Sequence, residues 1–342
     1  MTSKIGGGLS GKGIRDRALE CASEARRAVP GDFLMILMGG IGTARDIIDF
    51  VNAAKKERTI FGIGTRLIGM SENEIAQYFS TLFCDLESGT NHTEGLLKRV
   101  DMSYRKVRVK EVGNDGCDFK VYRTNVNIDA KAGQFVFAWI PGIGEKPFSV
   151  MDDKPLTLGV LERGYFTKRF NSLNVGDEFY IKGPYGRGVE VSSGSNGVIL
   201  VGGGCGVAGL LLPAKQLSGR NDVVNLLGAK DLGHLPDLEH FRRYGETFVA
   251  TEDGSYGVRG SVADLFREAR KDDLIRSGDY FFNCGPRAMV EAVLPLELQV
   301  SSGERIYSSV DYMTRCGVGI CGSCADSKGR RTCVEGPFMN LS

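Results

Sequence analysis

Residues 198–206 read Val-Ile-Leu-Val-Gly-Gly-Gly-Cys-Gly. The four apolar residues predict a buried strand, and the helical pattern over 207–216 predicts a helix directly after it. Between them, Gly202, Gly203, Gly204 and Gly206 let the backbone turn tightly and approach a phosphate. The spacing is not that of the G-x-G-x-x-G fingerprint, so a plain tight turn remains an alternative, but the strand–turn–helix order favours a dinucleotide site.

Apolar runs on both sides of this segment divide the chain into regions of different periodicity. Downstream, runs at 223–227, 247–250 and 280–282 alternate with helical stretches such as 287–294, which is typical of an open α/β domain. Upstream, short runs at 104–112, 118–126, 134–139, 157–161 and 178–182 predict a small antiparallel barrel. We place the domain boundaries at 1–100, 101–193, 194–300 and 301–342.

The first region, residues 1–100, alternates helix and strand. Helices are predicted at 13–28, 44–54 and 72–83, and strands at 33–38 and 59–63. Parallel sheets are normally covered on both faces, and two strands with these helices are too few for that. We therefore expect a partial (β/α)8-barrel segment that is incomplete by itself.

The composition excludes several classes of function. The 342 residues carry 43 lysines and arginines against 42 acids, so no global basic field points to nucleic acid. We find no apolar run of about 18 residues and no secretory leader, so we expect no transmembrane segment and a cytoplasmic location. Four of the nine cysteines lie within the last 27 residues, which favours metal binding over a disulfide framework.

Four of these cysteines follow the pattern C-x4-C-x2-C-x8-C, namely Cys316, Cys321, Cys324 and Cys333. Thiolates hold a plant-type 2Fe–2S cluster with this spacing, and the intervening glycines let the backbone wrap closely around the sulfurs. Structural zinc also takes four thiolates but typically uses two separate CxxC pairs, and only one is present here. A cluster that carries single electrons needs a flavin beside it to exchange hydride.

Two segments of the barrel region suit that flavin. In Lys146-Pro147-Phe148-Ser149, a strand edge with a fixed proline can present backbone groups and the Ser149 hydroxyl to a flavin ring. The stretch from Gly164 to Thr167 opens a predicted helix, whose free N–H groups can bind a pyrophosphate. An ordinary strand and an ordinary helix cap remain alternatives.

A third candidate, Cys284-Gly285-Pro286, follows the predicted strand at 280–282. Open α/β sheets hold ligands at the carboxyl ends of their strands, so the Cys284 thiol stands at an expected ligand position. The alternative is a buried cysteine that acts as a small hydrophobe.

The order of these motifs, with the glycine-rich stretch at 251–257, resembles the electron-transfer subunit of dihydroorotate dehydrogenase, within the ferredoxin-reductase superfamily. The resemblance covers about residues 102–342. It implies FAD at the two barrel segments, NAD(H) at the glycine turn and the Cys-Gly-Pro corner, and the 2Fe–2S cluster on the four cysteines. The chain departs from the family at Lys146, where arginine is usual; a lysine is a point charge, which predicts a differently aimed flavin contact.

The N-terminal region carries glycine segments after its two predicted strands, including Gly39, Gly40, Gly64 and Thr65. Such loops bind a phosphate in (β/α)8 barrels, or merely turn strand into helix. The region resembles the C-terminal part of the dihydroorotate dehydrogenase catalytic barrel, which implies FMN shared with a partner. The first six strands of that barrel are missing, with its substrate-binding asparagines, flavin lysine and catalytic base. Either a separate catalytic chain supplies them, or Met1 truncates a longer fusion.

The resemblance therefore implies an NAD-dependent oxidoreductase component of pyrimidine biosynthesis, which links FMN in a catalytic barrel to NAD+ through the cluster and FAD. It assigns no catalytic residue to this chain. A related reductase serving a hydrogenase, a sulfide dehydrogenase or ferredoxin, and a degenerate subunit that no longer binds nicotinamide, are the alternative hypotheses. Lys230 and Asp231 have opposite implications for NADPH and NADH, so that choice stays open.

Overall fold

The computed structural model describes residues 15–28, 35–38, 43–54, 59–62, 72–88, 103–114, 119–191, 197–235, 238–310, 313–319, 321–326 and 328–340. The chain divides into two compact units: residues 1–101 with 318–320, and residues 102–317 with 321–342. Within the described ranges, no helix has the length and apolar character needed to cross a membrane.

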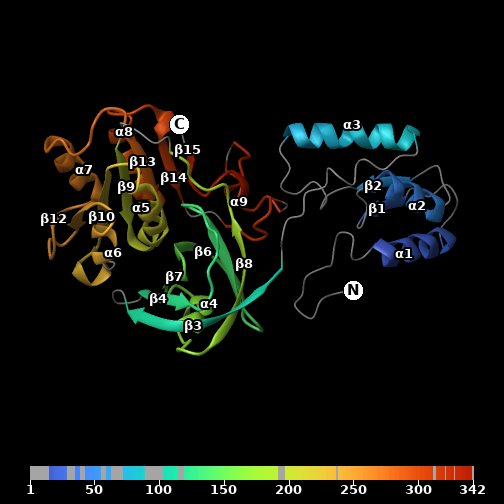
Figure 1. The fold of residues 1–342 in the computed structure, drawn as a ribbon, viewed down its shortest axis with the longest axis horizontal. Coiled ribbons are helices and arrows are strands. Elements are labelled where there is room, and N and C mark those ends of the chain that lie inside the picture. Colours follow the sequence, from blue (N-terminus) through green and yellow to red (C-terminus); the bar gives the residue numbers. More distant parts are fainter. Residues whose placement is uncertain are drawn as a thin grey trace. The chain divides into compact units, whose positions relative to one another are not determined.

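The first unit alternates helices with two parallel strands (Figure 1). Its elements are α1 (Arg15–Ala28), β1 (Met35–Met38), α2 (Ala44–Ala54), β2 (Thr59–Gly62) and α3 (Glu72–Ser88). β1 pairs with β2 from Met35↔Thr59 onward, and α2 begins where the Thr43 hydroxyl donates to Asp46 Oδ2 at 2.8 Å. The predicted elements are therefore confirmed, while their membership of a (β/α)8 barrel stays a prediction.

The second unit begins with a closed six-stranded antiparallel barrel, as predicted. Around the barrel the strand order is β3-β4-β7-β6-β5-β8. The strands are β3 (Arg105–Asn114), β4 (Phe119–Thr124), β5 (Phe135–Ile140), β6 (Gly144–Asp153), β7 (Leu156–Leu161) and β8 (Glu178–Tyr185), with α4 (Tyr165–Phe170) before β8. Alternate residues such as Tyr122 and Leu158 fill the barrel core, so the intervening residues face outward.

β6 confirms the strand edge predicted at Lys146–Ser149, although the predicted set of barrel strands left it out because Pro147 and its polar neighbours resemble a turn. Proline lacks an N–H and interrupts a strand that is paired on both sides. Here the first part of β6, as far as Ser149, pairs with β5, whereas its pairing with β7 begins only at Val150. Pro147 therefore occupies a part of the strand that has one pairing partner.

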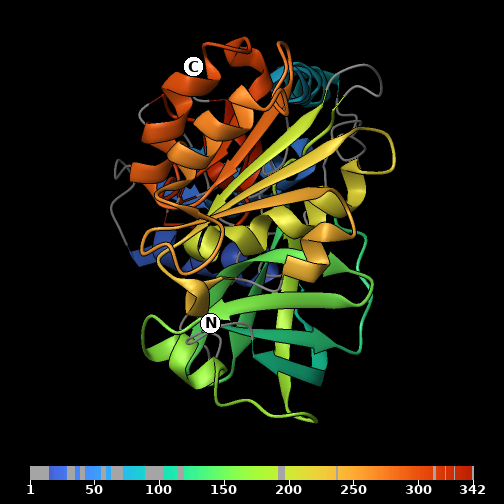
Figure 2. The same ribbon diagram turned by 90° about the vertical axis from the view of Figure 1, so that its left-hand side faces the viewer.

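A sheet of seven strands follows, in the order β12-β11-β10-β9-β13-β14-β15. Its strands are β9 (Val198–Gly203), β10 (Val223–Ala229), β11 (Glu246–Thr251), β12 (Val258–Arg259), β13 (Tyr280–Cys284), β14 (Ile306–Ser309) and β15 (Met339–Asn340). All pairs are parallel except β14–β15. β9 lies between β10 and β13, so the direction of winding reverses there. Ligands of open α/β sheets bind at such a point, outside the carboxyl ends of the strands. Figure 2 shows the strands of this sheet, yellow to orange, above the green barrel.

The helices of this sheet are η4 (Gly204–Leu210), α5 (Leu211–Leu217), η5 (Leu232–His234), α6 (Leu238–Arg242), α7 (Val262–Lys271), α8 (Arg287–Glu297), η6 (Gly303–Arg305) and α9 (Thr332–Glu335). The helix expected over 207–216 is in fact split into a 3₁₀ turn and a short α-helix. Glycines make up three of the seven residues of η4, which lowers its α-helical propensity. β14 precedes the four cysteines in the sequence and β15 follows them, and both strands lie at one edge of the same sheet.

Candidate cofactor site between the barrel and the parallel sheet

The carboxyl end of the parallel sheet and the outer face of the barrel enclose a cavity of about 770 Å³. This volume is within the range of small-molecule and cofactor sites. Gly203 and Gly204 of the glycine turn line the cavity, and so does Pro286 of the Cys-Gly-Pro corner. Outward residues of β4 and β7, including Val121 and Leu161, form the facing wall.

The glycine turn and the Cys-Gly-Pro corner are in backbone contact. A Cβ added at Gly206 would lie 2.3 Å from the carbonyl oxygen of Cys284 and 2.5 Å from the nitrogen of Gly285. At Gly203, it would lie 2.6 Å from the sulfur of Met289. Gly202 also has no room for a side chain, because an added Cβ would lie 2.7 Å from Leu210. These glycines therefore permit close approach between segments.

Ser149 of the barrel and Cys284 of the sheet converge beside this turn. A Cβ added at Gly209 would lie 3.0 Å from Cys284 Sγ and 3.2 Å from Ser149 Oγ. Cys284 is 8% exposed and Ser149 is half-buried. Two predicted site residues from different domains thus border the same small space.

The remaining flavin candidates lie along β6 and at α4. Phe148 turns inward and packs on Phe170, with ring centroids 5.5 Å apart, whereas Lys146 is exposed. The Thr167 hydroxyl accepts hydrogen bonds from the backbone nitrogens of residue 163 at 2.8 Å and of Gly164 at 3.0 Å. Thr167 therefore fixes the start of α4, and a Cβ at Gly164 would meet no atom within 4 Å, so the approach to this turn is open.

The cavity is also lined by Arg123, Arg163 and His234, which sequence reasoning did not select, and by Lys230, which it did. Arg123 and Arg163 project from the barrel side, and Lys230 and His234 from the loop after β10. The two arginines and Lys230 are cations, which suit the phosphates of a dinucleotide. Strand alternation predicts that Arg123 points out of the barrel, because its neighbour Tyr122 points inward. Only the tertiary fold shows that this outer face lies against the parallel sheet.

The two residues left open for NADPH and NADH have different surroundings. Lys230 lines the cavity. The Asp231 carboxylate lies 2.7 Å from His234 Nδ1, and this hydrogen bond is the main reason that the pKa of Asp231 lies below its ordinary value.

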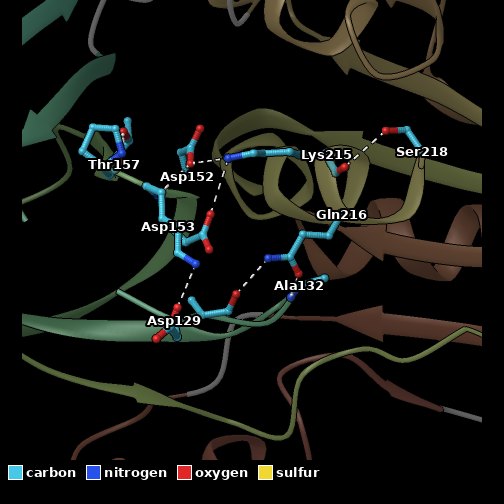
Figure 3. A network of polar contacts seen from close by, with 11 residues as sticks. Asp129, Ala132, Asp152, Asp153, Thr157, Lys215, Gln216 and Ser218 are labelled. Carbon is cyan, nitrogen blue, oxygen red and sulfur yellow. Dashed lines mark hydrogen bonds and ion pairs between the residues drawn. The ribbon is translucent and has the colours of Figure 1, made fainter. Parts of the chain in front are cut away.

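A polar network joins the barrel to the sheet beside the cavity (Figure 3). Lys215 of α5 donates to Asp152 at 2.8 Å and lies 3.5 Å from a carboxylate oxygen of Asp153. Burial lowers the pKa of Lys215, but the bond to Asp152 and the attraction of both carboxylates outweigh burial and raise it. The neighbouring Gln216 accepts from the nitrogen of Ala132 at 2.7 Å. Asp152 also lines the cavity, so this network holds one wall in place.

The cysteine segment brings two predicted ligands into contact. Cys324 and Cys333 are buried, and their sulfurs lie 3.4 Å apart, well beyond a disulfide bond. Two thiolates on one tetrahedral metal with bonds of about 2.3 Å lie about 3.7 Å apart, so this separation suits a shared metal. Among the described residues, however, no three or more metal-binding side chains gather into one site.

Cys321 and Cys316 form the other half of the set. Burial raises the pKa of the Cys321 thiol, but hydrogen bonds from Ser323 and Cys316 outweigh burial and lower it to about 6. Gly317 and Gly322 adopt φ angles of 79° and 68°, which side chains rarely adopt. The loop therefore has the backbone freedom and the easily ionised thiol that a metal-binding loop requires. Gly39, Gly40, Gly64 and Thr65 fall outside the described residues.

Comparison with known proteins places the chain in a family. It is 35% identical over 237 residues to a Thermococcus kodakarensis protein named probable dihydroorotate dehydrogenase B (NAD(+)), electron transfer subunit. The match covers 69% of this chain and 96% of that protein. The chain belongs to this family. A Methanocaldococcus jannaschii protein of the same name is 30% identical over 234 residues, with coverage of 68% and 88%. No family model matches the chain.

Solved structures support the same fold for the electron transfer subunit family. The NADH-dependent reduced ferredoxin–NADP oxidoreductase, solved to study electron bifurcation, matches with a TM-score of 0.61 and 27% identity, covering 68% of this chain and 87% of that one. The FAD/NAD-binding domain of a Vibrio cholerae nitric oxide dioxygenase matches with a TM-score of 0.52 and 17% identity, covering 60% and 98%. The barrel and the parallel sheet are therefore a ferredoxin-reductase-like pair of domains.

Proposed function

We propose that this chain is the electron-transfer component of an NAD-dependent dihydroorotate dehydrogenase and works in pyrimidine biosynthesis. The observation that carries the proposal is the approach of Ser149 and Cys284 to Gly209, beside the cavity that Gly203, Gly204 and Pro286 line. The chain's relatives are named as electron transfer subunits of this enzyme. The nicotinamide nucleotide would lie along the carboxyl ends of β9 and β10.

The barrel side of the cavity fits FAD. Ser149 offers a hydroxyl where the barrel meets the parallel sheet. The open turn at Gly164 and the side chain of Arg163 offer hydrogen-bond donors for a pyrophosphate. Lys146 is exposed and would meet the flavin as a point charge. The close contact of Gly206 with Cys284 would limit the space for the nicotinamide ring between the barrel and the sheet.

The cysteine segment fits a 2Fe–2S cluster. Cys324 and Cys333 would supply two adjacent thiolates, and Cys316 and Cys321 the other two, from residues 301–342, which we treat as the cluster-bearing segment. When bound, these groups supply one-electron exchange at the cysteines and hydride exchange at the flavin. Residues of the second unit would hold both groups.

The first unit would complete the catalytic partner. Within the described residues its sheet consists of β1 and β2 alone, and further barrel strands would pair with the outer edges of these two strands. We assign residues 1–100 to a (β/α)8-barrel segment that shares FMN with a catalytic chain, and we place the protein in the cytoplasm. The glycine segments at 39–40 and 64–65 are the FMN phosphate candidates.

Reconstitution of the full chain with iron, sulfide and FAD tests the proposal. We expect flavin and iron–sulfur absorbance together, and reduction of both by NADH. Cys321→Ser should abolish cluster reduction but retain the flavin band, whereas Cys84→Ser, an exposed cysteine on α3, should change neither. Full cluster reduction by NADH in Cys321→Ser would contradict the assignment.

A ferredoxin reductase is the second candidate, favoured by the similarity to the NADH-dependent reduced ferredoxin–NADP oxidoreductase. Ferredoxin and a dihydroorotate dehydrogenase catalytic chain can be offered as alternative acceptors to the NADH-reduced protein. Faster reoxidation by ferredoxin would favour this second function.

A further inference from the structure

A buried lysine stands on the outer wall of the barrel, away from the dinucleotide cavity. Only 6% of the Lys182 side chain on β8 is exposed. Its ammonium lies 3.0 Å from Glu145 Oε1, 4.7 Å from the ring centroid of Phe137 and 5.2 Å from that of Tyr104. Lysines are rarely buried to this extent unless they are paired, so the position calls for a reason.

The other groups around this cation define the local charge. The second carboxylate oxygen of Glu145 accepts a short hydrogen bond from the Tyr104 hydroxyl. Burial first, and then the bond to Glu145, raise the pKa of Tyr104 far above its ordinary value, so the phenol stays neutral. Of these three side chains, Lys182 and Glu145 are therefore the charged ones.

The cysteine loop packs on the same aromatic ring as Lys182. A Cβ at Gly317 would lie 2.7 Å from Phe137 Cε2 and 2.9 Å from Tyr185. Phe137 and Lys182 face each other across paired strands β5 and β8. The cation and the residue after Cys316 thus contact one ring. Glu145, the partner of the ammonium, is also bonded to Tyr104.

We propose that Lys182 raises the reduction potential of the iron–sulfur group held by the neighbouring cysteines. A cluster on four thiolates gains negative charge when it takes up an electron, and a buried cation stabilises that reduced form. The negative charge of Glu145 opposes this effect. The Glu145 side chain is 29% exposed and that of Lys182 only 6%, so water screens the charge of Glu145 more strongly. The inference rests on the proposed function, because it requires a cluster at Cys316.

A purely structural ion pair is the competing explanation. A buried pair often contributes little net stability, because desolvation of both charges offsets their attraction. The two explanations differ in sign. A structural pair predicts that loss of either charge has the same kind of effect, whereas an electrostatic role predicts opposite shifts of potential.

Redox titration of the reconstituted full chain, followed by optical and electron paramagnetic resonance signals, tests the inference. Lys182→Met should lower the cluster's midpoint potential by the equivalent of about tenfold in the reduction equilibrium, about 59 mV for one electron. Lys182→Arg should keep the potential, and Glu145→Gln should raise it. Lys106→Met on the adjacent strand β3, where the side chain is 55% exposed, is the matched control and should leave the potential unchanged.

Two results would overturn the inference. One is a wild-type potential in Lys182→Met; the other is a shift of the same sign in Lys182→Met and Glu145→Gln. If Lys182→Met fails to fold, Glu145→Gln alone decides, since an unchanged or lowered potential contradicts the role. A wild-type chain that binds no cluster would refute the proposed function itself, whereas a cluster with an unshifted potential refutes this inference only.

Discussion

Replacement of Gly206 by alanine tests whether the contact between the glycine turn and the Cys-Gly-Pro corner shapes the cavity. The new Cβ would meet three backbone atoms of Cys284 and Gly285 at 2.3, 2.4 and 2.5 Å. Ordinary van der Waals contact needs at least 3.4 Å, so the two segments must separate by about 1 Å. The obstacle is backbone on both sides, and no side chain can rotate away.

The expected cost follows from this geometry. Overpacking a core typically costs about 1–3 kcal/mol, and a clash with backbone belongs at the upper end, about 3 kcal/mol. With an m-value of about 3 kcal/mol/M in urea, the unfolding midpoint should fall by about 1 M. NADH affinity should fall about tenfold, because the corner that moves also lines the cavity.

Urea unfolding followed by circular dichroism, and an NADH titration of the flavin-loaded protein, measure these two effects. Gly219→Ala adds the same methyl group where no atom lies within 4 Å, and it should change the stability by less than about 0.5 kcal/mol. Equal stability and NADH affinity in the two variants would show that the turn and the corner are not in contact.

Three further predictions concern polar groups. Burial raises the pKa of Glu297 to about 7, so the folded state binds a proton that the unfolded state loses above its ordinary value of 4.5. Stability should therefore fall by about 3 kcal/mol as the pH rises from about 4.5 to 7, and Glu297→Gln should flatten this slope in urea titrations. Lys215→Met removes the cation between Asp152 and Asp153 and should lower the stability by about 1–3 kcal/mol in the same assay. Thr167→Val removes the acceptor of two backbone N–H groups and should cost about 1 kcal/mol and weaken FAD retention in equilibrium dialysis.

Each of these has a matched control. Glu291→Gln on the same helix α8 is exposed and should keep the wild-type pH slope, so equal slopes in Glu291→Gln and Glu297→Gln would contradict a buried proton. Lys131→Met removes an exposed ion pair with Glu190 and should change stability by less than about 1 kcal/mol. Thr167→Ser retains the acceptor oxygen, and FAD loss from both Thr167 variants would point to a lost methyl contact instead.

The sequence by itself determined the local elements. Helix 44–54 and the strands that begin at 59 and 198 were placed within a residue or two, because apolar periodicity reports which side chains a backbone can bury together. The glycine turn after β9 was found for a similar reason, since strand, glycines and helix follow one another directly. The C-x4-C-x2-C spacing predicts a metal-binding loop because the ligands are close in sequence.

Only the tertiary structure decided which distant residues meet. Ser149 and Cys284 belong to different domains and approach the same glycine, a contact that depends on how the barrel is seated against the sheet. The sequence predicts a strand edge at Lys146–Ser149, but the length of β6 and its place in the barrel depend on one-sided pairing around Pro147, which is a property of the whole barrel. In the sequence, Lys182 resembles an ordinary surface lysine. Its burial depends on the folded barrel, which brings Glu145 and the rings of Tyr104 and Phe137 around its ammonium.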